Sequence, residues 1–163
     1  MKIAITGHTS GLGKIFYEHY TKLGYEVIGM SRSNGYCLPD NISNVAAEAN
    51  NCDLFINNAY CDTSQSELLH RTTVPVVSCG SMGADFDQSN SYFKNKRHLE
   101  DTHKKVKRTT DRKMLLLKMG YLENYADRHP ILYSEILSAV DFWLTSNRIS
   151  MIEFENHVNI YKG

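Results

Sequence analysis

The sequence predicts an α/β fold with a mostly parallel sheet flanked by helices. Apolar segments of strand length alternate with segments of helical periodicity along the chain. The first strand-like segment, residues 2–6, runs directly into a glycine-rich turn and then a helix. The chain has 163 residues, a length that suits one domain with its own core. We therefore expect residues 1–163 to form a single three-layer αβα domain.

The individual elements follow from apolar periodicity and from turn residues. The helix at 11–23 repeats apolar residues at helical spacing and ends before Gly24. Residues 31–41 are polar and predict at most a stub of strand, and residues 60–72 predict at most one helical turn around Leu68. The remaining segments predict strands at 2–6, 25–30, 53–57, 74–79, 113–118 and 150–154, and helices at 42–50, 91–110 and 131–145.

Composition limits the classes of function. No apolar run approaches the length of a membrane-spanning helix, and no signal-peptide pattern precedes the first strand, so we expect a cytoplasmic protein. The four cysteines have no metal-site spacing and predict reduced thiols rather than a metal centre.

The formal net charge is zero, but residues 94–113 hold nine Lys or Arg against three acids. Phosphate contact with nucleic acid is one interpretation of this segment, but no aromatic residue interleaves its basic cluster, so a solvated helix face is favoured. The cluster comprises Lys104, Lys105, Lys107, Arg108, Arg112 and Lys113.

The glycine spacing after the first strand indicates a phosphate-bearing ligand. Gly7, Gly11 and Gly13 allow the backbone to turn tightly and to approach a pyrophosphate without Cβ clashes. The helix that follows offers unpaired N–H groups to the anion. A dinucleotide is the predicted ligand; the alternative is a turn that uses glycine for its geometry alone.

Four motifs resemble those of the short-chain dehydrogenase/reductase family, in the family's order and over residues 1 to about 156. TGHTSGLG (residues 6–13) resembles the family's TGxxxGxG turn, and Asn57-Asn58-Ala59 resembles its NNAG, with Tyr60 in place of the last Gly. Tyr92 and Lys96 fit YxxxK. Gly120 and Leu122 resemble PG-x-[VI], although Met119 replaces the Pro and Asn124 stands where a Thr is common.

The resemblance implies a Rossmann-like domain that transfers hydride between a nicotinamide and a small carbonyl or alcohol substrate. It implies Ser81, Tyr92 and Lys96 as catalytic residues, with Ser78 as the alternative serine because Ser81 lies unusually close to Tyr92. The implied cofactor-binding residues are Gly7, Thr9, Ser10, Gly11, Leu12, Gly13, Ser31, Arg32, Asn57, Asn58, Ala59, Tyr92, Lys96, Gly120 and Leu122.

Residue chemistry supports the roles of Tyr92 and Lys96. Residues four apart share a helix face, so both can act on one small volume. A free phenol has a pKa of about 10. A neighbouring ammonium favours the phenolate and brings the hydroxyl towards proton transfer at neutral pH.

The residues after the second strand favour NADP(H) over NAD(H). Ser31 stands where an acid would accept hydrogen bonds from a ribose diol, and the Arg32 guanidinium suits a 2′-phosphate. The alternative is that Arg32 is a solvated turn residue. Asp40 is a further candidate neighbour of the adenine by resemblance.

The chain departs from the family mainly by shortened connections. A full helix is implied after the second strand, where only residues 32–35 stand, and the long helix that carries a catalytic Asn has no matching position in residues 60–72. An alternative function is therefore a cofactor-binding module with weak or no turnover. The polar YxxxK helix predicts a monomer, or a homodimer that does not pair through the family's long helices.

Overall fold

A computed structural model describes residues 1–87, 89–122, 130–146 and 148–156. Six parallel strands form one sheet in the order β2-β1-β3-β4-β5-β6. The strands are β1 (Lys2–Thr6), β2 (Glu26–Met30), β3 (Leu54–Asn57), β4 (Val76–Ser81), β5 (Met114–Met119) and β6 (Met151–Phe154). The predicted α/β class and parallel sheet are confirmed.

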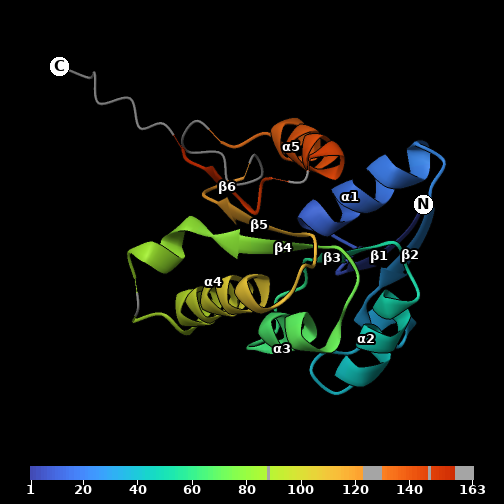
Figure 1. The fold of residues 1–163 in the computed structure, drawn as a ribbon, viewed down its shortest axis with the longest axis horizontal. Coiled ribbons are helices and arrows are strands. Elements are labelled where there is room, and N and C mark those ends of the chain that lie inside the picture. Colours follow the sequence, from blue (N-terminus) through green and yellow to red (C-terminus); the bar gives the residue numbers. More distant parts are fainter. Residues whose placement is uncertain (88, 123–129, 147, 157–163) are drawn as a thin grey trace.

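Helices cover both faces of the sheet. α1 and α5 lie on one face, and α2, α3 and α4 lie on the other (Figure 1). Their bounds are α1 (Gly11–Lys22), α2 (Ile42–Asn50), α3 (Ser64–Arg71), α4 (Ser91–Thr109) and α5 (Tyr133–Thr145), with short 3₁₀ turns η1 (Arg32–Asn34) and η2 (Met82–Asp85). The three-layer prediction is therefore confirmed, and the predicted bounds of the strands and of helices α1, α2, α4 and α5 lie within two residues of the observed ones.

The central strands are buried on both sides, as parallel strands between helical layers are. In β1, Ile3 and Ile5 pack toward α1 and α5, whereas Ala4 packs toward α2 and α3. Strand β5 alternates in the same way, with Leu115 and Leu117 on the first side. This arrangement brings the carboxyl ends of all strands to one edge of the sheet, where polar side chains follow them.

Two connections depart from the long helices that the family resemblance implies. The sequence predicts at most one helical turn in residues 60–72, and this prediction is wrong because α3 is a helix of eight residues. Leu68 and Leu69 of α3 are buried, but so are three of its polar residues, which the periodicity of apolar residues cannot detect: Ser64, Gln65 and Ser66.

The other departure lies between β2 and α2. Residues 31–41 form η1 and turns, and the described part of the sheet has no strand beyond β2. Strand β2 is therefore an edge strand. The sheet has one strand fewer on the side of β1 and β2 than a Rossmann fold with a third strand there. None of the described helices combines the length and apolarity needed to cross a membrane.

Candidate functional site

The glycine turn between β1 and α1 has the backbone that its glycines permit. Gly7 and Gly11 have φ angles of 73° and 53°, in the left-handed region that favours glycine. Gly13 lies so close to the Gly7 carbonyl that a Cβ at this position would overlap it. Ser10, the N-cap of α1, makes no side-chain capping bond, so the first N–H groups of the helix are open to an anion. The exposed Thr9 and Ser10 and the first residues of α1 thus fit a pyrophosphate.

Residues after β3 are tied to this turn. Thr6 Oγ1 accepts hydrogen bonds from the backbone N–H groups of Asn58 and Ala59, both at 3.0 Å. The Asn58 side chain donates to the Thr6 carbonyl at 3.1 Å. The predicted Asn58 and Ala59 are therefore held beside the glycine turn. Asn57 differs, because its buried side chain points into the protein and donates to the Gln65 carbonyl at 2.8 Å.

Arg32, which lies just after the end of β2, has an unpaired side chain among the described residues. Arg32 is exposed, and its guanidinium has no hydrogen bond or ion pair within the described part of the chain. The Ser31 hydroxyl is instead bonded to Ser33 at 2.8 Å and to Asn34 at 3.2 Å. An unpaired arginine beside the glycine turn fits an additional phosphate on the adenosine ribose. Asp40 is exposed on the same connection.

Helix α4 places Tyr92 and Lys96 on one face, as predicted. Asn90 caps the helix and accepts a hydrogen bond from the Tyr92 N–H at 2.8 Å. Lys96 Nζ lies 5.4 Å from the centre of the Tyr92 ring and 5.6 Å from the centre of the Tyr60 ring. The two tyrosine rings meet edge to face at 4.7 Å. Tyr60, which departs from the family motif, is thus a direct neighbour of the predicted catalytic pair.

Lys96 is almost fully buried, with 4% of its surface exposed. Its Nζ donates to Gln65 Oε1 and to the Cys79 carbonyl, each at 2.7 Å. Burial lowers the pKa of Lys96 to about 8, and neither of these two hydrogen-bond partners carries a negative charge that would oppose the shift. Sequence reasoning missed Gln65, and no periodic signal marks it. Helix α3 contains no Asn, so the family's catalytic Asn has no counterpart in this helix.

The two candidate serines occupy different places in β4. Ser78 is completely buried within the sheet, and its Oγ has no hydrogen-bond partner among the described residues. Ser81 ends the strand, is partly exposed, and accepts a hydrogen bond from the Gly83 N–H at 3.2 Å. Ser81 is therefore the serine at the edge of the sheet that also carries the glycine turn.

Gly120 and Leu122 continue from β5 at the same edge. The Gly120 N–H donates to the Phe154 carbonyl at 3.1 Å, and a Cβ on Gly120 would overlap the Asn156 side chain. Leu122 forms an isolated parallel bridge with Ile131. Asn124, which the sequence analysis compared with a family Thr, lies outside the described residues.

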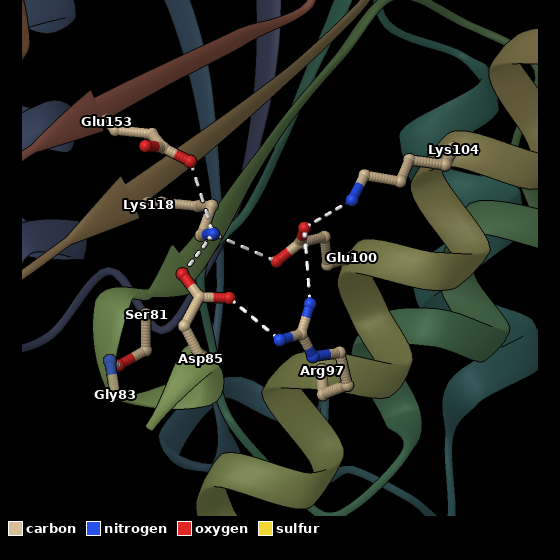
Figure 2. A network of polar contacts seen from close by, with 8 residues as sticks. All are labelled: Ser81, Gly83, Asp85, Arg97, Glu100, Lys104, Lys118 and Glu153. Carbon is tan, nitrogen blue, oxygen red and sulfur yellow. Dashed lines mark hydrogen bonds and ion pairs between the residues drawn. The ribbon is translucent and has the colours of Figure 1, made fainter. Parts of the chain in front are cut away.

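A network of ion pairs lies beside Ser81 (Figure 2). Lys118 of β5, which is 3% exposed, has three carboxylates around its Nζ: Asp85 at 2.6 Å, Glu100 at 3.2 Å and Glu153 at 3.2 Å. Burial alone would lower the pKa of Lys118, but the three carboxylates outweigh it and raise this pKa to about 12.

Two further cations of α4 close the network. Arg97 pairs with Asp85 at 2.8 Å, and Lys104 pairs with Glu100. The carboxylates are thereby matched by cations, and the pKa of Asp85 falls below its ordinary value through its hydrogen bond to Lys118. The network ties η2, which follows Ser81, to α4, which carries Tyr92 and Lys96.

The basic cluster of the sequence is not one uniform surface. Arg112 donates to the Val74 and Leu69 carbonyls and to Thr72. Lys113 donates to the Leu144 carbonyl at 2.7 Å and stacks on Trp143. These two cations hold the fold together, and the cluster that remains on the surface is smaller than the sequence implies.

No family model and no curated protein matches the sequence. Solved structures do match it, and they share its fold. A short-chain dehydrogenase from Streptomyces avermitilis is 16% identical, with a TM-score of 0.74 over 94% of this chain and 88% of the other. A short-chain dehydrogenase from Burkholderia cenocepacia in complex with NADP is 14% identical, with a TM-score of 0.73 over 94% and 87% of the two chains.

A third solved structure, 4-hydroxyisoleucine dehydrogenase complexed with NADH, matches 99% of this chain and 99% of its own at 14% identity and a TM-score of 0.73. At such identities the likeness concerns the fold. The structure from Burkholderia cenocepacia contains NADP and that of 4-hydroxyisoleucine dehydrogenase contains NADH, so the structural similarity does not distinguish between the two cofactors. The chain therefore shares the Rossmann fold of these dehydrogenases over nearly its whole length.

Proposed function

We propose that the chain is a short-chain dehydrogenase/reductase that uses NADP(H) and a small carbonyl or alcohol substrate. The observation that carries this proposal is the pairing of Tyr92 with a buried Lys96 on one face of α4, at the edge of the sheet that carries the glycine turn. When bound, NADP(H) supplies or accepts a hydride at its nicotinamide ring.

The residues of the chain would supply binding, orientation and the proton. In reduction, the Tyr92 hydroxyl donates a proton to the carbonyl oxygen of the substrate, and in oxidation the phenolate takes it back. The Lys96 ammonium favours the phenolate of Tyr92. The Ser81 hydroxyl accepts from the Gly83 N–H, which leaves its own proton to donate to the substrate oxygen.

Cofactor binding and its preference are tested by titration. We expect NADPH to bind more tightly than NADH, and Arg32→Ala to weaken NADPH binding by about tenfold, because one charge-assisted contact to the 2′-phosphate is lost. NADPH fluorescence measures both affinities. Arg148→Ala, which removes another exposed arginine, serves as the matched control. Equal affinity for the two cofactors would contradict the preference for NADP(H).

Turnover is tested by NADPH oxidation against a panel of small aldehydes and ketones. We expect Tyr92→Phe to lower kcat by about 100-fold or more, because it removes the general acid and leaves the ring in place. Tyr25→Phe, at the far end of the sheet, is the control and keeps wild-type turnover. Unchanged turnover in Tyr92→Phe would contradict the assignment.

A binding module without turnover is the second candidate. The lack of an Asn in α3 favours it, because the catalytic set of the family is then incomplete. Tight NADPH binding without any Tyr92-dependent turnover across the panel supports this candidate, and Tyr92-dependent turnover removes it.

A further inference from the structure

We propose that Gln65 is a positioning residue for Lys96, and that its neutral amide holds the ammonium beside Tyr92 without cancelling its charge. Where this concerns the reaction, it rests on the proposed function. The contact itself is independent of that function: Lys96 Nζ lies 2.7 Å from Gln65 Oε1, and both residues are buried.

The hydrogen bonds of Gln65 fix the orientation of its amide. Its Nε2 donates to the Asn57 carbonyl at 2.8 Å and to the Cys79 carbonyl at 3.3 Å. Because carbonyl oxygens only accept, both require the NH₂ side of the amide. A flipped amide would place its NH₂ against an ammonium and its oxygen against two carbonyls. Gln65 Oε1 therefore has to face Lys96.

The backbone carbonyl of Gln65 is also held by a hydrogen bond. The Asn57 side chain donates to the Gln65 carbonyl at 2.8 Å, so the two residues exchange bonds in both directions. This places the start of α3 against the ends of β3 and β4. The acceptor for Lys96 is thus part of a rigid, buried assembly, and a short polar helix suffices to build it.

The charge of the acceptor matters as much as its position. In the part of the chain that the structure describes, the groups placed around the Lys96 ammonium are the Gln65 amide, the Cys79 carbonyl and the rings of Tyr60 and Tyr92, and the Cys79 thiol is near enough to interact electrostatically. Burial raises the pKa of the Cys79 thiol to about 12, so this group is neutral near pH 7. None of these groups carries a negative charge at that pH. The charge of Lys96 therefore acts on Tyr92 without an intervening anion.

A carboxylate at position 65 would occupy the same space with the opposite effect. This carboxylate would hold the Lys96 ammonium, but it would also neutralise the positive charge of Lys96, as the carboxylates around Lys118 do for that lysine. The Tyr92 phenol would then lose the electrostatic help that makes it a proton donor and acceptor near neutral pH. An amide orients the lysine and leaves its charge available.

Two near-isosteric variants of the full chain separate these effects. Gln65→Glu adds a carboxylate, and Gln65→Met removes the acceptor while keeping the length of the side chain. ¹³C NMR of the lysine ε-carbons, with Lys96→Met to assign the signal, follows the titration of Lys96 directly. We expect its midpoint to rise by more than one pH unit in Gln65→Glu and to fall in Gln65→Met.

The tyrosine provides the readout that a purely structural role would not move. The ¹³Cζ resonance of Tyr92 is expected to titrate at higher pH in Gln65→Glu than in the wild type. Ser66→Ala, a buried neighbour in α3 whose hydroxyl has no hydrogen-bond partner among the described residues, is the matched control and shifts neither group. Thermal melting of each variant identifies any that fails to fold, and the remaining variant then decides.

The outcomes for the inference and for the proposed function are distinct. If the Lys96 midpoint is the same in the wild type, Gln65→Glu and Gln65→Met, the inference is overturned. If the Lys96 midpoint moves but the Tyr92 midpoint does not, the coupling to Tyr92 is overturned. A wild-type chain that binds no NADPH contradicts the proposed function, while the ligand-free titrations still test the role of Gln65.

Discussion

Lys96 and Lys118 are both buried at the same edge of the sheet, but their surroundings are opposite. Lys96 donates to a side-chain amide and a backbone carbonyl, and burial lowers its pKa to about 8. Lys118 lies among Asp85, Glu100 and Glu153, which raise its pKa to about 12 despite its burial. Burial therefore does not determine the state of a lysine in this protein; the charge of its partners does.

The difference assigns the two residues to different tasks. A cation matched by carboxylates exerts little field on other groups, and Lys118 joins η2, α4, β5 and β6 (Figure 2). A cation with neutral partners costs more to bury, but its charge remains available to a neighbour such as Tyr92. The network around Lys118 thus belongs to the scaffold of the site, and Lys96 belongs to its chemistry under the proposed function.

The largest expected effect on stability comes from removal of the matched cation. Lys118→Met is expected to lower the free energy of unfolding by about 3 kcal/mol, because Glu100 remains buried and loses one of its cations. Lys96→Met is expected to cost less than half as much, since it leaves only neutral acceptors behind. Urea unfolding, followed by the fluorescence of the single, buried Trp143, measures both losses.

The control for this pair is Lys105→Met, an exposed lysine of α4 that is expected to change stability by less than about 0.5 kcal/mol. Equal losses for Lys96→Met and Lys118→Met would contradict the distinction between the two buried lysines.

The sequence predicts much of the arrangement that makes this comparison possible. Strict alternation of apolar strands and helices is a local signal, and it predicts the parallel sheet and its layers. The spacing of Tyr92 and Lys96 predicts that they share a helix face, since this follows from helix geometry alone. The glycines of residues 7–13 likewise predict their turn, because the required backbone is local.

The partners of the two lysines escape sequence reasoning for a physical reason. Gln65 is 31 residues from Lys96, and Asp85 is 33 residues from Lys118, so both contacts exist only after the strands pair. The length of helix α3 also escapes sequence reasoning, because three of its five buried residues are polar: Ser64, Gln65 and Ser66. Lys118 is the last residue of the strand predicted at 113–118 and resembles an ordinary exposed strand end until Glu100 of α4 is placed beside it.

The pH dependence of stability sharpens the comparison further. In the folded chain the pKa of Lys96 is about 8, whereas an unfolded lysine has its ordinary value of 10.5. Between these values the unfolded state binds more protons, so the contribution of Lys96 to stability rises with pH through this window, by about 2 to 3 kcal/mol. Lys118 has a raised pKa, so its contribution is complete below the ordinary value and is lost only as pH rises through about 12.

The measurement is the difference in unfolding free energy between the wild type and each Met variant at pH 7.5, 9 and 10. The difference is needed because Cys79 and Tyr20, whose pKa values are raised by burial, destabilise the folded state as pH rises through the same range. We expect a rising wild-type advantage over Lys96→Met and a nearly constant one over Lys118→Met. A flat difference for Lys96→Met would contradict its lowered pKa.

The smallest effect distinguishes the carboxylates around Lys118 from one another. The Glu153 side chain is 46% exposed, so its ion pair is screened by water, and Glu153→Gln is expected to cost less than about 0.5 kcal/mol. Asp85 is 26% exposed and closer to Lys118, at 2.6 Å, so Asp85→Asn is expected to cost about 1 kcal/mol.

The lowered pKa of Asp85 gives stability that is present above its unfolded pKa and is lost as pH falls through the lower, folded value. Urea unfolding at pH 7 and pH 3 should therefore show a smaller cost of Asp85→Asn at the lower pH. A cost for Glu153→Gln equal to that of Asp85→Asn at pH 7 would mean that burial does not set the strength of these pairs.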